Sequence, residues 1–318
     1  MTLVILEAAL HDKIWGGTAL KNFHFPIKGD HVGEAWAIAA HKNGESTIKD
    51  GPFAGQTLTQ LWQDNPNLFG GHEANEAFPL LIKILDAHQD LSIQVHPNDK
   101  QSREKYGKTE CWYILDATPN AKIYYGHYAQ SRGELKAMVE KEDWEHMLRT
   151  VPVKKGDFFY VPAGTFHALG AGIVALETQQ SSDTTYRFYD FDRVDATTGQ
   201  KRDLQIADAL DVTTVPHHDP VLKQTTTIVD QTIVTRLVTS VKFTVEKLSV
   251  RGLSQFNLAH HYELFTVIDG AGRVNQTAVK KGDSFILFDD ESISYALDGD
   301  MTIIKSFVTT DDNPDQRF

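Results

Sequence analysis

An internal repeat constrains the fold of this chain more than any other feature of its sequence. Segments 153–172 and 279–300 both open with Val-Lys-Lys-Gly-Asp and continue as an apolar run, a turn and a second apolar run. Upstream, segments 110–123 and 263–274 also correspond, each starting with Glu and a run of aromatic and aliphatic residues. The Gly-Asp pair predicts a tight turn, because Gly tolerates positive φ and Asp hydrogen-bonds its own backbone. Four landmarks recurring in one order indicate a duplicated unit and not chance reuse of turn sequences.

The duplicated unit consists of strands. Short runs rich in β-branched and aromatic residues, bounded by Gly, Pro, Asp and Asn, dominate the chain. Helical spacing of apolar residues is confined to 56–66, 129–151 and 202–212, and the second of these should break into two helices. Two antiparallel double-sheet units predict a mostly β protein made of two jelly-roll barrels of the cupin type. We expect a small helical insertion at about 129–151, a first domain over 1–235 and a second over 236–318.

The composition limits the classes of partner. The 318-residue chain has a formal net charge of −12, which disfavours bulk attraction to nucleic acid or to an anionic membrane. No apolar run approaches the length of a membrane span, and segment 1–17 lacks the basic start and the cleavage site of a signal peptide. The single cysteine, Cys111, cannot form an intrachain disulfide and fits a reducing compartment. We therefore expect a cytoplasmic protein without nucleic-acid or membrane partners, while its oligomeric state stays open.

Four residues of the first copy are candidate metal ligands. Gln94 and His96 are two apart in the apolar segment 91–100, so on a strand they point to the same face. Glu110 opens the next landmark, and His167 follows a Pro-Ala-Gly turn. Two imidazoles, one carboxylate and one amide oxygen suit a divalent cation, with Zn²⁺ as the default. An isolated interior histidine is more often a hydrogen-bonded core residue, but the shared strand face and the turn favour the metal hypothesis.

The second copy differs where this chemistry would lie. Tyr295 stands near the place that corresponds to His167, while His260, His261 and Glu263 come just before or at the start of the matching strand. The pattern is that of a metal-binding barrel that has lost its last histidine. We expect the second copy to be structural and non-catalytic, with a weak metal site as the alternative.

Seven segments carry a family signature, and they run in order from residue 14 to residue 193. They are 14–17, 33–41, 78–87, 91–99, 107–115, 161–172 and 177–193. Together they resemble the type I mannose-6-phosphate isomerases (phosphomannose isomerases) in their short bacterial form. The resemblance implies a zinc-dependent aldose–ketose isomerase that interconverts mannose 6-phosphate and fructose 6-phosphate, a small phosphosugar, through an enediol intermediate. It also implies one Zn²⁺ per chain, with Gln94, His96, Glu110 and His167 as its ligands.

The same resemblance assigns a catalytic role to Arg187, and the positions of Asp183 and Lys108 make them further catalytic candidates. Arg187 matches the essential active-site arginine of the family, and its guanidinium stays protonated and offers planar donors to an oxyanion. Asp183 is expected to orient Arg187 or to act in proton transfer. Lys108 shares a strand face with Glu110 if that segment is a strand, where it would shuttle a proton or contact phosphate. The alternative for Lys108 is a surface lysine whose stem lies along the barrel mouth.

Substrate contacts are expected from the same segments. Trp15, Glu34 and Ser92 are expected to contact the sugar, and Arg193 is expected to contact the phosphate. Lys83 interrupts an apolar run, so it lies either at a strand edge or in an ion pair inside the protein. The group that removes the carbon-bound proton stays open, since a His, Asp, Glu or metal-bound hydroxide would all serve.

Two other functions compete with the isomerase. Two histidines and one carboxylate also describe the iron site of a non-haem oxygenase, but Gln94 as an extra ligand and the basic residues suited to phosphate argue against it. A non-catalytic sugar-binding or regulatory cupin is the other alternative. In such a protein the metal ligands would be relics and Arg187 would be superfluous, so their joint presence argues against that class too.

Overall fold

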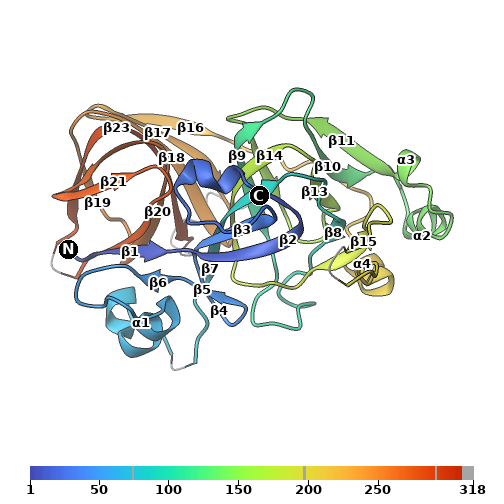
Figure 1. Ribbon diagram of the computed structural model, residues 1–318, viewed down its shortest axis with the longest axis horizontal. Coiled ribbons are helices and arrows are strands. Elements are labelled where there is room, and N and C mark those ends of the chain that lie inside the picture. Colours follow the sequence, from blue (N-terminus) through green and yellow to red (C-terminus); the bar gives the residue numbers. More distant parts are fainter. Residues whose placement is uncertain (74, 196–197, 291, 310–318) are drawn as a thin grey trace.

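The structure is a computed structural model that describes residues 1–73, 75–195, 198–290 and 292–309. It is mostly β, with a cupin-type fold in which two barrels lie side by side along the long axis (Figure 1). This agrees with the fold class predicted from the repeat. Within the described ranges, no helix combines the length and apolar character needed to cross a membrane.

The first barrel consists of a six-stranded and a five-stranded sheet. The six-stranded sheet has the order β12-β9-β14-β7-β3-β2, with strands β12 (Phe158–Val161), β9 (Glu110–Ala117), β14 (Ile173–Gln180), β7 (Leu80–Ala87), β3 (Val32–Ile38) and β2 (Ala9–Gly17). The five-stranded sheet has the order β11-β10-β13-β8-β15, with strands β11 (Leu148–Pro152), β10 (Lys122–His127), β13 (His167–Leu169), β8 (Ile93–Val95) and β15 (Tyr186–Tyr189).

The second barrel is formed by one large sheet. Its path is β16-β17-β18-β23-β20-β22-β1-β6, with β19 and β21 pairing at its side. These strands are β16 (Thr225–Val229), β17 (Thr232–Thr239), β18 (Phe243–Arg251), β19 (Ser254–Asn257), β20 (Tyr262–Val274), β21 (Thr277–Lys280), β22 (Ser284–Phe288), β23 (Ser294–Val308), β1 (Leu3–Glu7) and β6 (Thr47–Ile48). The N-terminal strand β1 therefore pairs with β22 of the second barrel. The division at residue 235 stays a prediction.

The two copies have the same strand order. The path β22-β20-β23-β18-β17-β16 of the second barrel repeats β12-β9-β14-β7-β3-β2 of the first. Their Lys-Lys-Gly-Asp turns have the same geometry: Gly156 and Gly282 have φ values of 94° and 93°, and Asp157 and Asp283 each accept the N–H three residues before at 2.9 Å. The turn and the duplication predicted from the sequence are confirmed.

The helical segments lie outside the barrels. They are α1 (Leu58–Asp64), α2 (Arg132–Glu140), α3 (Trp144–Met147), α4 (Ile206–Val212) and the 3₁₀ turns η1 (Ala19–Phe23) and η2 (Pro66–Phe69). The segment 129–151 does break into two helices, at the far end of the first barrel in Figure 1. Its last residues are a strand, because 148–152 pairs with β10. A two-stranded pair, β4 (Ala40–His41) with β5 (Gly44–Glu45), completes the elements.

One apolar core passes between the barrels. It contains Leu80 and Ile82 from the first barrel and Val245 and Ile304 from the second, all nearly or fully buried. Separate apolar clusters fill the interior of each barrel. The barrels are therefore packed on each other through side chains of their central strands, which leaves the mouth of the first barrel free for a site.

Candidate active site

A cavity of about 330 Å³ opens at the mouth of the first barrel. Of the residues predicted from the sequence, it is lined by Trp15, Glu34, Ser92, Gln94, Lys108, Asp183 and Arg187. Strands β2, β3, β8 and β15 and the segments just before β8, β9 and β15 supply these side chains. A larger cavity, of about 760 Å³, lies between α1, η2 and the second barrel and is lined by His260 and His261 but by none of the residues predicted for the first-barrel site. We therefore identify the smaller cavity as the candidate active site.

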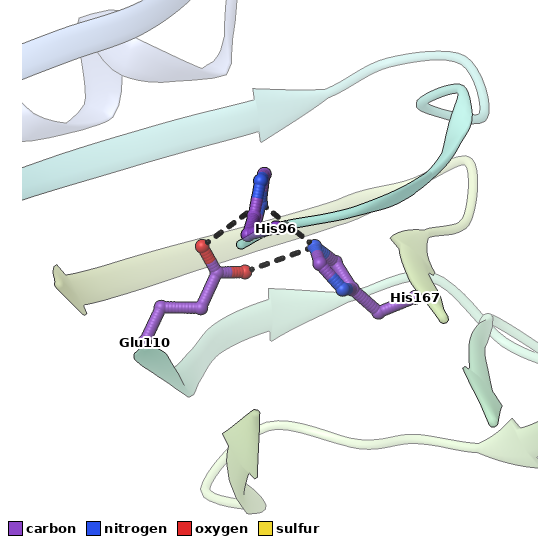
Figure 2. Close-up of side chains that lie close together, drawn as sticks. All are labelled: His96, Glu110 and His167. Carbon is purple, nitrogen blue, oxygen red and sulfur yellow. Dashed lines mark hydrogen bonds and ion pairs between the residues drawn. The ribbon is translucent and has the colours of Figure 1, made fainter. Parts of the chain in front are cut away.

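Three buried side chains converge beneath this cavity. His96 follows β8, Glu110 begins β9 and His167 begins β13, and each is at most 1% exposed. The Nε2 atoms of the two histidines lie 3.1 Å apart. Glu110 meets both: Oε2 is 3.4 Å from His96 Nε2, and Oε1 is 3.2 Å from His167 Nε2. Figure 2 shows the three side chains pointing toward one another from separate segments.

Hydrogen bonds to backbone carbonyls orient both imidazoles. His96 Nδ1 lies 2.9 Å from the carbonyl oxygen of Thr184, and His167 Nδ1 lies 2.8 Å from that of Thr165. A carbonyl only accepts, so each Nδ1 carries the proton and each Nε2 directs its lone pair at the cluster. Burial lowers the pKa of both rings, that of His96 to about 3 with help from the charge of Lys108. Both rings are therefore neutral at pH 7, the form that binds a metal.

The donor set fits a divalent cation. Two nitrogen lone pairs and a carboxylate face one point, and Oε1 of Glu110 is buried without a hydrogen-bond donor. Gln94 Nε2 lies 3.4 Å from His167 Nε2, and an exchange of its amide oxygen and nitrogen would turn the oxygen toward the same point. Lys108 Nζ already lies 2.8 Å from His96 Nε2 and 2.7 Å from Glu110 Oε2. The cluster therefore attracts positive charge and offers the ligand types of zinc.

A chain of buried charges forms the wall of the cavity. Lys83 of β7 lies between two carboxylates, with Nζ 3.8 Å from Glu34 Oε2 and 3.7 Å from Glu177 Oε1. The indole N–H groups of Trp36 and Trp112 donate to Glu34 at 2.6 Å and to Glu177 at 2.8 Å. Of the two alternatives for Lys83, the internal ion pair is therefore correct.

The two carboxyl groups of this wall have opposite pKa shifts. Burial acts to raise the pKa of Glu34, but the ammonium groups of Lys83 and Lys13 outweigh it and lower the pKa to about 2. Burial raises the pKa of Glu177, and the neighbouring charge of Glu110 adds to that effect. Glu34 is thus a fixed negative charge, whereas Glu177 can exchange a proton nearer neutral pH.

Two arginines, Arg187 and Arg202, also line the cavity. Arg187 donates from Nε to Ser92 Oγ at 3.1 Å and from Nη1 to the carbonyl oxygen of Asp203 at 2.9 Å. Arg202 donates from Nε and Nη2 to the two oxygens of Asp190, at 2.8 and 2.6 Å. Both guanidinium groups are thereby aligned, and both lie on the cavity lining.

Arg193 and Asp183 differ from the arrangement expected from the sequence. Arg193 binds Asp190 at 2.6 Å and the carbonyl oxygen of Asp90 at 2.6 Å, and it lines a different, shallow depression. Asp183 lines the cavity but accepts a hydrogen bond from Asn43 at 2.8 Å. No hydrogen bond joins Asp183 to Arg187 within the described ranges. The predicted roles of Arg193 at the phosphate and of Asp183 beside Arg187 stay predictions.

Sequence reasoning missed several residues of the cavity, including Lys13, Glu177, Arg202 and Gln205. Glu177 lies in the segment 177–193 that resembles the family. Gln179 pairs with Glu110 of β9, and Glu177 is two residues before Gln179, so its side chain is on the same face of the sheet as the ligand Glu110. Arg202 stands outside every motif, so no sequence signal pointed to it.

The described residues of the second barrel form no equivalent cluster, and the strand register explains why. In the first barrel Gln94 lies opposite His167, and in the second Phe256 lies opposite Tyr295. Leu258, two residues after Phe256, corresponds to His96. Three of the four predicted ligands are thus replaced by Phe, Leu and Tyr.

The fourth position of the second barrel keeps its carboxylate. Glu263 lies two residues before Phe265, just as Glu110 lies two residues before Trp112. Phe265 and Trp112 pair with equivalent residues of the neighbouring strand, so Glu263 has the position of Glu110. Lys305 neutralises Glu263, with Nζ 3.3 Å from Oε2. In the part of the chain that the structure describes, the first-barrel cluster is the one group of His, Cys, Asp and Glu with metal-binding geometry.

Comparison with known proteins decides the family. Residues 3–123 match the model of the phosphomannose isomerase type I catalytic domain, and residues 233–308 match the mannose-6-phosphate isomerase cupin domain. The mannose-6-phosphate isomerase ManA of Bacillus subtilis is 44% identical over 300 residues, 89% of this chain and 92% of that protein. The chain belongs to the type I phosphomannose isomerases.

Further relatives of this phosphomannose isomerase agree. The mannose-6-phosphate isomerase of Streptococcus mutans is 45% identical over 313 residues, 95% of this chain and 97% of that protein. A crystal structure of the mannose 6-phosphate isomerase from Bacillus subtilis superimposes with a TM-score of 0.92 at 41% identity and covers 96% of this chain and 100% of that chain. The Salmonella typhimurium enzyme, at 16% identity with a TM-score of 0.72 over 98% of this chain and 100% of that chain, shares the fold. Membership of this family speaks against the oxygenase and the non-catalytic cupin.

Proposed function

We propose that this phosphomannose isomerase interconverts mannose 6-phosphate and fructose 6-phosphate in the cavity at the mouth of the first barrel. The observation that carries the proposal is the convergence of His96, Glu110 and His167 beneath a cavity that is lined by carboxyl groups and by arginines. The relatives that are 44 and 45% identical over most of their lengths are mannose-6-phosphate isomerases, which supports the same activity here.

The cofactor of the proposed enzyme is Zn²⁺, one per chain. Gln94, His96, Glu110 and His167 would hold it, and a mannose 6-phosphate isomerase of the same fold is described as bound with zinc and yttrium. When bound, the ion supplies Lewis-acid polarisation of the substrate carbonyl and stabilises negative charge on the enediol oxygens. Only Glu110 contributes an anionic ligand, and the neutral histidines and amide leave a net positive charge at the site.

The isomerisation requires two proton movements. In the direction of the ketose, one proton leaves C2 and returns to C1, while the hydroxyl proton on O2 moves to O1. Glu177 is the best candidate for the carbon-bound proton, since it lines the cavity and its pKa is raised by burial. Lys108, whose Nζ lies 2.7 Å from Glu110, is within reach of oxygens bound at the cluster and would carry the hydroxyl proton. Asp183 is a second candidate for that transfer.

Binding of the phosphosugar is assigned to the remaining walls. Trp15, Glu34 and Ser92 would contact the sugar. The guanidinium groups of Arg187 and Arg202 would take the phosphate and the developing negative charge, because guanidinium binds oxyanions with planar, fixed donors. Arg187 would serve nearest the reacting carbons, since its Nε is held by Ser92, which neighbours the ligand-bearing strand.

We further propose that the first barrel is the catalytic cupin domain and that the second barrel, whose sheet also includes β1, β6, β16 and β17, is a non-catalytic one. The buried free thiol of Cys111 supports a cytoplasmic location, since free cysteines are typical of a reducing compartment.

The test is an isomerase assay on mannose 6-phosphate coupled to detection of fructose 6-phosphate, before and after chelation, with metal analysis of the same sample. We expect activity to disappear on chelation and to return with Zn²⁺, at about one metal per chain. Arg187→Ala should keep its zinc while kcat falls by about 10²-fold, the scale of losing one oxyanion donor. A zinc-loaded protein without activity on mannose 6-phosphate would overturn the proposal.

A further inference from the structure

The loop of residues 97–108 joins two members of the metal cluster. It begins directly after His96 and ends two residues before Glu110. Its two ends are in contact, because the backbone N–H of Lys108 donates to the carbonyl oxygen of Pro97 at 2.9 Å. The relative positions of the two ligands therefore depend on how this loop closes.

Asp99 closes the loop. Its Oδ1 accepts the backbone N–H of Gly107 at 2.8 Å, and a Cβ atom on Gly107 would lie only 2.4 Å from the carbonyl carbon of Asn98. The same oxygen accepts Nε2 of Gln180 at 2.9 Å, and Oε1 of Gln180 accepts the N–H of Thr109 at 3.1 Å. One carboxylate thus connects the start of the loop, its end and the last residue of β14.

The second barrel reaches this carboxylate through Lys242. Lys242 lies in the turn between β17 and β18, and its ammonium donates to Oδ2 of Asp99, the oxygen that the loop leaves free. The turn itself is held by Ser240, whose Oγ accepts the N–H of Lys242 at 3.1 Å and of Phe243 at 3.1 Å. The side chains of Lys242 and Asp99 are 32% and 37% exposed, so the pair acts by fixing a geometry more than by its Coulomb energy.

We propose that Lys242 and Asp99 are positioning residues through which the second barrel holds the loop of residues 97–108, and with it the ligands at its two ends, in the geometry that binds the metal. The second barrel has lost three of its own ligand positions, and this contact gives it a role in the site of the first. The inference rests on the proposed function only for the identity of the ion and its ligands.

Groups that orient metal ligands from outside the coordination sphere change metal affinity by about 10- to 100-fold when removed. Asp99 and Lys242 do not touch the ligands, and they act through the backbone of the loop. We therefore expect the low end of that range. A matched control is Lys100, a neighbouring lysine of the same loop without a hydrogen bond or ion pair from its ammonium within the described ranges.

The experiment compares Lys242→Met, Asp99→Ala, the double variant and Lys100→Met. Amide hydrogen exchange of residues 97–110 in the zinc-free protein reports the loop, and competition with a chromogenic chelator gives the Kd for Zn²⁺. We expect faster exchange and about 10-fold weaker zinc binding in Lys242→Met and Asp99→Ala. At saturating Zn²⁺, kcat and KM should approach those of the unmodified protein, and Lys100→Met should match that protein in every measurement.

The double variant tests the route of the effect. If Lys242 acts through Asp99, the double variant binds zinc as weakly as Asp99→Ala alone, since contacting residues in one network are not additive. Unchanged exchange and unchanged zinc affinity in both single variants would overturn the inference, as would purely additive losses. An unmodified protein that binds zinc but does not isomerise mannose 6-phosphate would refute the proposed function instead, while the zinc and exchange measurements would still decide the positioning role.

Discussion

Thr178 and Ser306 occupy equivalent places in the two barrels, and their side-chain oxygens form a buried hydrogen bond of 3.1 Å with each other. Thr178 of β14 lies opposite Cys111 in β9, and Ser306 of β23 lies opposite Leu264 in β20, the equivalent pair of strands. Equivalent residues of a duplicated unit touch only near the axis that relates the copies. The barrels are therefore packed back to back, with their central strands β14 and β23 meeting at the axis.

This contact predicts a coupling between the barrels. Thr178→Val removes the hydrogen-bond partner of the Ser306 hydroxyl, and Ser306→Ala removes the partner of the Thr178 hydroxyl. Each variant leaves one buried hydroxyl without this bond, so each should lower the free energy of unfolding by about 1–3 kcal/mol. Urea unfolding of the two single variants and the double variant measures the coupling. The double variant should lose less than the sum of the single losses, because no unpaired hydroxyl remains. Additive losses would show that the two side chains do not act together.

Glu110 should be required for the metal. In Glu110→Gln the carboxylate becomes a neutral amide of the same shape, so we expect a folded protein that loses most of its zinc and its isomerase activity. Zinc content after dialysis, measured by mass spectrometry, checks this. Glu263→Gln is the matched control, since Glu263 has the equivalent position in the second barrel, and it should keep its zinc. Full zinc occupancy in Glu110→Gln would remove Glu110 from the ligand set.

Arg202 and Arg193 can be separated by one pair of variants. Both guanidinium groups bind Asp190, but Arg202 lines the cavity and Arg193 does not. A hydrogen bond to a charged group is worth about 1.5–3 kcal/mol. Arg202→Met should therefore raise KM for mannose 6-phosphate by roughly 10- to 100-fold and change kcat less. Arg193→Met should leave KM nearly unchanged, and the reverse pattern would assign the phosphate to Arg193, as the family resemblance implies.

The ion pair of Glu34 with Lys83 predicts a dependence of stability on pH. The pKa of Glu34 falls from 4.5 to about 2 in the folded protein. A lowered carboxyl pKa stabilises the folded state above the unfolded pKa, and the contribution is lost as pH falls from there through the folded value. It amounts to roughly 3 kcal/mol at neutral pH.

Glu34→Gln removes that contribution, so the difference in unfolding free energy between it and the unmodified protein should shrink steadily below about pH 4.5. Urea unfolding at a series of pH values from 7 to 3 measures the difference. Glu7→Gln, at an exposed position of β1, is the control and should change stability little at any pH. A constant difference across the series would show that Glu34 is not the titrating group.

Lys305 should matter for stability and not for the metal. Its Nζ lies 2.9 Å from Glu246 Oε2 and 3.3 Å from Glu263 Oε2, and all three side chains are largely buried. Lys305→Met leaves two buried carboxylates without their shared cation, which costs about 3–5 kcal/mol for a broken buried pair. Thermal unfolding measures this, with Lys280→Met, at an exposed position of the same barrel, as the control. A loss of zinc from folded Lys305→Met would show that Lys305 also acts on the metal site.

The strand β14 shows where prediction from the sequence stopped. All eight of its residues are buried, because one face lines the interior of the first barrel and the other meets the second barrel. A strand buried on both faces has no alternation of polar and apolar residues from which its inward face can be recognised. The role of Glu177 in the cavity was hidden for that reason, although the residue was inside a recognised segment.

Arg202 and Arg193 show a second limit. Their side chains meet the same carboxylate from positions nine residues apart, and only the tertiary structure decides which of them reaches the cavity. The sequence expectation chose Arg193 from the family pattern. In the same way, Asp183 is held by Asn43, a residue 140 positions away that no local pattern connects to it.

The sequence by itself determined the duplicated unit, its Lys-Lys-Gly-Asp turns and the identity of the residues that converge as the His96, Glu110 and His167 cluster. These follow from local chemistry: a turn needs Gly and Asp, and a ligand needs a donor atom of the right kind. Only the tertiary structure decided that the barrels pack back to back, which arginine lines the cavity and that Lys242 of one barrel binds Asp99 of the other. Those relations depend on strand register and on contacts between residues far apart in the chain, and no local pattern encodes them.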